Sequence, residues 1–165
     1  MPLMSVLLAA TLLPSAVVGV PPGNEAEETY LGKLATCEES WFNWKEDDRR
    51  MRQYLNRFDA NFTRSEEEPA LLPKSPGNVL GFPLVKVYPQ SVGMGLGFSV
   101  QLGGPFANIR SEVEHRLGKP LACESSDGMT SCGVELGENK SLTLTAFGNA
   151  ADAINLLGCF YYYEK

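Results

Sequence analysis

The most reactive side chains in this sequence are four cysteines, Cys37, Cys123, Cys132 and Cys159. An even number of cysteines in an exported chain is typical of disulfide bonds formed in an oxidising compartment. Asp127-Gly128 is a strong signal for a two-residue hairpin turn, and a turn centred there places Cys123 opposite Cys132 in a non-hydrogen-bonded pair. The sequence therefore predicts a Cys123–Cys132 cross-strand disulfide and, by elimination, a Cys37–Cys159 disulfide.

Other uses of these cysteines fit the sequence less well. A redox or metal pair at Cys123 and Cys132 would need a C-x-x-C spacing or a histidine partner, and neither accompanies them. His115 is the single histidine, which excludes a multi-histidine metal site. We therefore expect neither a metal nor a cofactor.

A search for a nucleophile with its base finds no catalytic set. Residues 97–101, Gly-Phe-Ser-Val-Gln, lack the closing glycine of the G-x-S-x-G elbow of serine hydrolases. His115 lies between Glu114 and Arg116, away from the apolar stripe of its predicted helix, so we expect it at the surface. The sequence therefore predicts no catalytic residue.

A candidate binding surface comes from two strand patterns. Apolar residues alternate with Gly95, Gly97 and Ser99, which leaves one face of this strand almost without side chains. Near the C-terminus three consecutive tyrosines follow Phe160, and tyrosine is favoured at interfaces. Alternatively, a neighbouring loop could fill the open strand face, and a helix could cover the tyrosines. The candidate binding residues are Gly95, Gly97, Ser99, Tyr161, Tyr162 and Tyr163.

The beginning of the chain predicts export. Residues 1–22 carry no charged side chain, and residues 6–20 are largely apolar before the Pro-Pro-Gly at 21–23. This pattern is typical of a cleaved signal peptide, which we place at residues 1–19, although an uncleaved membrane anchor is the alternative. The rest, residues 20–165, is predicted to be secreted or periplasmic, touching the membrane only during export.

Length and charge narrow the function further. A chain of 165 residues suits one domain, and its net charge of −6 argues against nucleic acid as a partner. We expect a single α+β domain in which two helices pack on an antiparallel sheet made of a hairpin and a meander. The predicted helices are 38–60 and 106–117, a Pro- and Glu-rich loop covers 64–81, and the predicted strands are 84–88, 94–102, 120–124, 131–136, 141–147 and 154–163.

The second predicted helix and the sheet after it resemble a known class of module. The helix ends in Leu117-Gly118-Lys119-Pro120 and leads into antiparallel strands. This arrangement resembles small exported helix-plus-sheet modules, such as outer-membrane assembly lipoproteins of the BamE type and the β-lactamase inhibitor proteins. The resemblance is limited to this segment, and we infer no function from it.

Two function classes remain open. The first is a non-catalytic binding or accessory domain of the cell envelope or periplasm, whose partner is another envelope protein or a glycan. The second is an envelope hydrolase that uses paired carboxylates.

Glycosylation at the sequons of Asn61 and Asn139 would require a eukaryotic secretory pathway.

Overall fold

The structure, a computed structural model, describes residues 22–40, 56, 58–92, 95–137, 139–148 and 153–162. Side chains are described for all of these except residues 22–27, 90–92, 95 and 96. The predicted leader at 1–19 and Tyr163 lie outside these ranges, as do residues 41–55 of the predicted first helix. Within the described ranges, no helix is long and apolar enough to cross a membrane.

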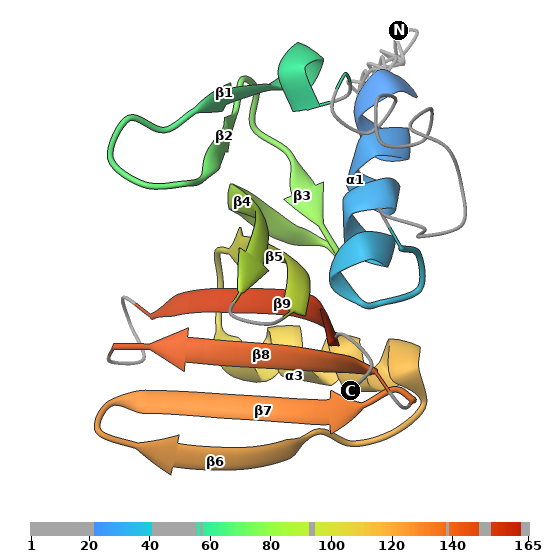
Figure 1. Ribbon diagram of the computed structural model, residues 1–165, viewed down its shortest axis with the longest axis vertical. Coiled ribbons are helices and arrows are strands. Elements are labelled where there is room, and N and C mark those ends of the chain that lie inside the picture. Colours follow the sequence, from blue (N-terminus) through green and yellow to red (C-terminus); the bar gives the residue numbers. More distant parts are fainter. Residues whose placement is uncertain are drawn as a thin grey trace, which may run out of the picture.

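Antiparallel strands dominate the fold (Figure 1). They follow the order β1-β2-β4-β5-β9-β8-β7-β6 across one sheet, and β3 pairs with β4 off this path. The strands are β1 (Phe62–Arg64), β2 (Leu71–Pro73), β3 (Asn78–Val79), β4 (Phe82–Val92), β5 (Gly95–Leu102), β6 (Ala122–Ser126), β7 (Met129–Glu135), β8 (Lys140–Phe147) and β9 (Ile154–Tyr162). The protein is therefore a single sheet-dominated domain rather than the more even α+β mixture predicted.

The C-terminal half of the sheet follows the prediction closely. The predicted hairpin at 84–102 is β4 and β5, and the four predicted strands that follow are β6 to β9 with slightly different ends. The last strand, β9, pairs with β5 on one side and with β8 on the other. This central position accounts for the apolar residues on both faces of β9.

The predicted loop at 64–81 is only partly a loop. It contains β2 and β3, and β1 ends at its first residue, Arg64. These strands have two or three residues each, so pairing defines them rather than any local pattern: β2 and β3 pair with β4, and β1 pairs with β2.

Two longer helices and a helical segment at residues 58–61 complete the described fold. The first, α1 (Pro22–Ala35), was not predicted, and proline at its start fits the first turn of a helix. Residues 36–39 form a turn and a bend after α1, so the predicted helix at 38–60 does not begin there, whereas residues 56 and 58–60 near its predicted end are helical. The second, α3 (Phe106–Leu117), confirms the prediction, since Gly118 ends it in the left-handed conformation with φ of 66°.

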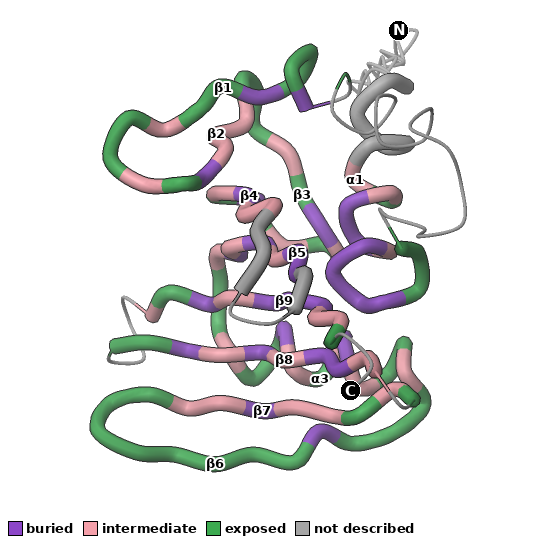
Figure 2. Tube along the Cα trace, in the orientation of Figure 1, coloured by how far each residue is buried: buried purple, intermediate pink, exposed green. Residues whose placement is uncertain are grey.

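The strand register gives the sheet two different faces. Phe98, Cys159 and Leu142 are direct neighbours across β5, β9 and β8, and all three are fully buried. We call their side the core face. Leu31 and Leu34 of α1 and the buried residues of α3 belong to the same apolar core (Figure 2). In Figure 1, α3 lies behind β8 and β9, so the opposite side of these strands is not covered by it.

Both predicted disulfides are present. Cys123 and Cys132 pair across β6 and β7 with Cα atoms 4.0 Å apart, in the predicted register. Cys37, just after α1, is bonded to Cys159 of β9. Two disulfides indicate an oxidising compartment outside the cytosol. The second bond holds α1 against the central strand of the sheet.

Candidate functional site

The side of β5, β9 and β8 opposite the core face has an unusual composition. We call it the open face and define it by thirteen residues that the register places there. They are Gly95, Gly97, Ser99, Gln101, Ser141, Thr143, Thr145, Phe147, Ile154, Leu156, Gly158, Phe160 and Tyr162. None is charged, whereas the chain average of 21% would give about three charged residues. Depletion of charge together with exposed aromatic residues is typical of the centre of a protein interface.

The middle of the open face is closed by an aromatic ring. Gly97 lies opposite Phe160, and Ser99 lies opposite Gly158. A Cβ at Gly158 would lie 3.0 Å from Cε2 of Phe160, so the ring covers this glycine. The ring of Phe160 thus occupies part of the face that was predicted to be bare at Gly95, Gly97 and Ser99.

The tyrosines are divided between the two faces of β9. Tyr162 is on the open face, is 51% exposed, and its hydroxyl lies 2.9 Å from Oγ of Ser141. Tyr161 is on the core face, and its hydroxyl donates to the carbonyl of Glu39 after α1. Burial raises the pKa of Tyr161. The structure therefore brings Tyr162 together with Gly95, Gly97 and Ser99 and separates Tyr161 from them.

An exposed apolar row marks the other end of the open face. Met129, Phe147 and Ile154 are direct neighbours on β7, β8 and β9, and they are 39%, 40% and 45% exposed. Sequence reasoning missed them because the row exists only through the register of three strands. At the usual strand rise, the distance along β9 from this row to Tyr162 is about 27 Å.

Charged side chains border this surface. Glu124 of β6 and Glu135 of β7 are exposed on the same side of the sheet. On β4, Lys86 forms an ion pair with Glu68, whose other carboxylate oxygen accepts a hydrogen bond from Tyr88 at 3.1 Å. The uncharged centre is thus flanked by carboxylates on its β6 side and by a neutralised pair on its β4 side.

The bonded pair on β4 also bears on the hydrolase hypothesis. Hydrogen bonds from Lys86 and Tyr88 hold the pKa of Glu68 below its ordinary value. The same ion pair raises the pKa of Lys86. A glycosidase acid needs a carboxyl with a raised pKa, so Glu68 does not suit that role.

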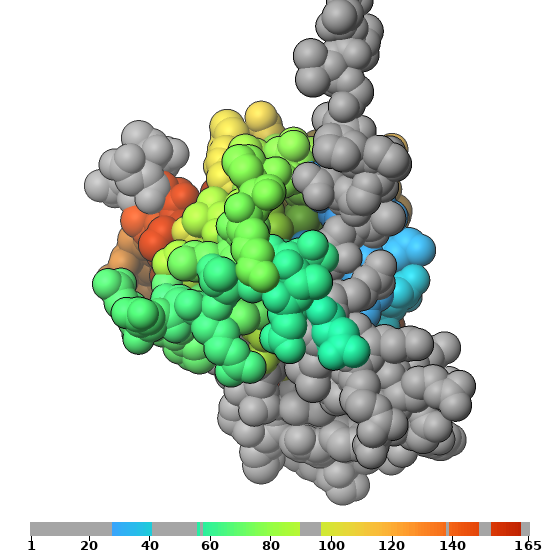
Figure 3. All heavy atoms as spheres, turned by 90° about the horizontal axis from the view of Figure 1, so that it is seen from above, coloured from blue at the N-terminus to red at the C-terminus, as the bar shows by residue number. Residues whose placement is uncertain are grey.

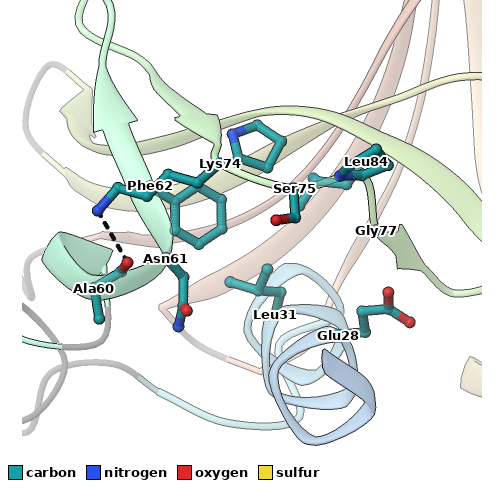
Figure 4. Close-up of a pocket in the computed structure, with 11 residues that line it drawn as sticks. Glu28, Leu31, Ala60, Asn61, Phe62, Lys74, Ser75, Gly77 and Leu84 are labelled. Atoms are coloured by element: carbon teal, nitrogen blue, oxygen red, sulfur yellow. Dashed lines mark hydrogen bonds between the residues drawn. The ribbon is translucent and has the colours of Figure 1, made fainter. Parts of the chain in front are cut away.

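A cavity of about 290 Å³ (Figure 4) lies between α1 and the β1–β2 hairpin, at the opposite end of the molecule from β6 (Figure 1). It separates α1 from the chain between residues 60 and 77, and Leu31 and Phe62 face each other across it. In Figure 3, the green segment that contains β2 and β3 covers much of this end of the molecule. No sequence pattern predicts this cavity, because residues far apart in the chain form it.

The charged residues of this cavity are engaged in holding its walls together. Lys74 donates to the carbonyl oxygens of Asp59 and Ala60, each at 2.9 Å, and Glu28 accepts from the backbone N–H of Asn78 at 2.7 Å. Glu28 is the one acidic residue among the described residues that line the cavity. A pair of carboxylates for hydrolysis is therefore not present in its described lining.

Other chemistry has little support in the described part of the chain. His115 is exposed on α3. Among the described residues, no group of three or more His, Cys, Asp or Glu side chains could hold a metal ion. Comparisons with protein-family models, with curated proteins and with solved structures found no match to this chain. The open face of the sheet is therefore the best candidate for a functional surface in the described part of the chain.

Proposed function

We propose that this chain is an exported, disulfide-stabilised, non-catalytic binding domain that holds a partner protein on its open face. The observation that carries the proposal is the uncharged surface of β5, β9 and β8, with exposed apolar residues at both ends. The two disulfides support a place in the periplasm or outside the cell.

The chemistry of the surface favours a protein over a glycan. Met129, Phe147 and Ile154 offer an apolar row without hydrogen-bonding groups, and such rows pack well against apolar side chains. Tyr162 adds a half-exposed ring whose hydroxyl is already bonded to Ser141. A partner with an apolar centre and basic residues facing Glu124 and Glu135 would complement this surface.

The test compares two lysine substitutions in the full-length exported protein. Thr143→Lys places a charge at the centre of the open face, and Ser111→Lys places one on the exposed side of α3 as a control. Complexes are crosslinked in the native compartment and quantified by mass spectrometry. We expect a stoichiometric protein partner with wild type and Ser111→Lys, and at least a tenfold loss with Thr143→Lys.

Three other outcomes would contradict the proposal. Equal recovery with both variants would exclude the open face as the binding surface. Binding to a glycan array without any protein partner would show that the partner class is wrong. Turnover of a polysaccharide or peptide substrate by the purified protein would show that it is an enzyme.

A further inference from the structure

The outer edge of β6 is a second surface of this protein, which borders the open face at Glu124. β6 is the last strand of the sheet, and no described strand pairs with its outer side (Figure 1). All five of its residues are exposed (Figure 2). We infer that this edge receives an extended, lysine- or arginine-bearing segment of another polypeptide as an added strand.

The hairpin geometry fixes which backbone groups face outward. Asp127 and Gly128 both have positive φ, 46° and 78°, as in a type I′ turn. Such a turn makes Ser126 and Met129 a hydrogen-bonded pair, and pairs then alternate along the strands. Glu124 and Ser126 therefore direct their backbone groups to β7, whereas Cys123 and Ser125 direct theirs away from the sheet.

Two side-chain contacts hold β6 in place against β7 before any further strand is added. The Cys123–Cys132 disulfide joins β6 to β7, and the hydroxyls of Ser125 and Thr130 lie 3.0 Å apart across the same pair of strands. A strand that is already rigid loses little conformational entropy when another strand is added. Binding by strand addition is a known mode of peptide recognition, in which the main chain supplies most of the hydrogen bonds.

The usual protections of an edge strand are weak here. Natural edges are shielded by proline, lysine, bulges or a covering segment. β6 consists of Ala-Cys-Glu-Ser-Ser and keeps an unbroken register with β7 from residue 122 to 126. Glu124 is its one charged residue, so a partner that neutralises this carboxylate meets a small, regular edge.

The negative charge of the β6–β7 hairpin favours a basic partner. Residues 121–136 include Glu124, Asp127 and Glu135 and contain no lysine or arginine. Lys119 lies just before this hairpin, and its ammonium donates to the carbonyl of Glu135. A second copy of this chain would add another acidic hairpin at the same edge. A basic residue of the added strand, placed beside Glu124, would instead form a favourable cross-strand pair.

The test uses an acetylated, amidated peptide in which lysine alternates with valine and threonine, and an otherwise identical peptide with glutamate in place of lysine. Amide hydrogen exchange is followed by NMR on the oxidised full-length protein. In the free protein, the amides of Cys123 and Ser125 should exchange faster than those of Glu124 and Ser126. Millimolar lysine peptide should slow exchange at Cys123 and Ser125 at least tenfold, and the glutamate peptide should not.

Two substitutions separate backbone pairing from charge. Ser125→Pro removes an outward N–H without removing a bond to β7 and should abolish the protection, whereas Ser125→Ala should retain it. If Ser125→Pro does not fold, Glu124→Lys tests the inference instead. In this variant the lysine peptide should no longer slow exchange at Cys123 and Ser125, and the glutamate peptide should slow it. No slowing with the lysine peptide, or slow exchange at Cys123 and Ser125 before its addition, would overturn the inference.

Discussion

The ring of Phe160 lies against Gly158, two residues before it on the same face of β9. A Cβ at Gly158 would lie 3.0 Å from Cε2 of this ring and 2.8 Å from Cβ of Ser99 on β5. Glycine at this position therefore lets the ring of Phe160 cover it and lets β5 and β9 pair without a clash. The packing in the middle of the open face depends on this contact.

We predict that Gly158→Ala destabilises the fold by about 1–3 kcal/mol, because an added methyl group overpacks this site. The double variant Ser99→Gly/Gly158→Ala exchanges the small residue between the two strands and should recover most of that loss. Urea unfolding of the three proteins measures the effect. A single variant as stable as wild type would show that β5 and β9 can separate at no cost.

The two disulfides should contribute unequally to stability. Cys37–Cys159 joins residues separated by 122 positions, and Cys123–Cys132 joins residues separated by 9. In the chain-entropy model, these loops correspond to about 5 and about 3 kcal/mol. Replacing each pair with alanine and measuring urea unfolding should give the larger loss for Cys37 and Cys159. The reverse order would contradict the model for this fold.

Glu114 should make stability depend on pH. Its carboxylate accepts from the backbone N–H of Leu121 and from Arg110, each at 2.9 Å, and these bonds lower its pKa, the backbone bond having the larger effect. Stability from Glu114 is therefore present above pH 4.5 and is lost as pH falls through the lowered pKa. Glu114→Gln should melt at a lower temperature than wild type at pH 7, and the gap should narrow at lower pH. A gap that stays constant in thermal unfolding down to pH 2.5 would contradict this role.

Substitution of Asn155 should lower the free energy of unfolding. It is fully buried on β9, and its amide nitrogen donates to the carbonyls of Leu102 at 3.3 Å and Gly104 at 2.9 Å, just before α3 begins. Asn155→Ala leaves these carbonyls without this donor, which costs about 1–3 kcal/mol. Asn155→Asp adds a buried negative charge beside them and should cost more. Urea unfolding at pH 7 tests the order, and an aspartate variant as stable as the alanine variant would contradict it.

Local signals predicted the C-terminal half of the fold. The Asp127-Gly128 turn fixed a register that the structure confirms, including the pairing of Cys123 with Cys132. Gly118 likewise predicted the end of α3. The hairpin turn and this helix end each depend on only a few adjacent residues. Where backbone conformation is set by the residue itself, sequence reasoning was sufficient.

The features that sequence reasoning missed depend on distant contacts. The helix α1 carries a short apolar stripe, Leu31, Leu34 and Ala35, after a Pro-Pro-Gly segment that suggests a break. The strands β2 and β3 are too short for any periodic pattern. Of the candidate binding residues, Tyr161 could not be separated from Tyr162 until one face of β9 was known to hold the core, and Phe160 was not included.

The Cys37–Cys159 bond also has a consequence for biogenesis. Of these four cysteines Cys159 is synthesised last, so among them Cys37 can pair only with Cys123 or Cys132 until β9 appears. An early bond between Cys37 and either of them must be exchanged before the native pair can form. A cell that makes this protein therefore needs thiol–disulfide isomerase activity, or a hairpin that closes its own bond first.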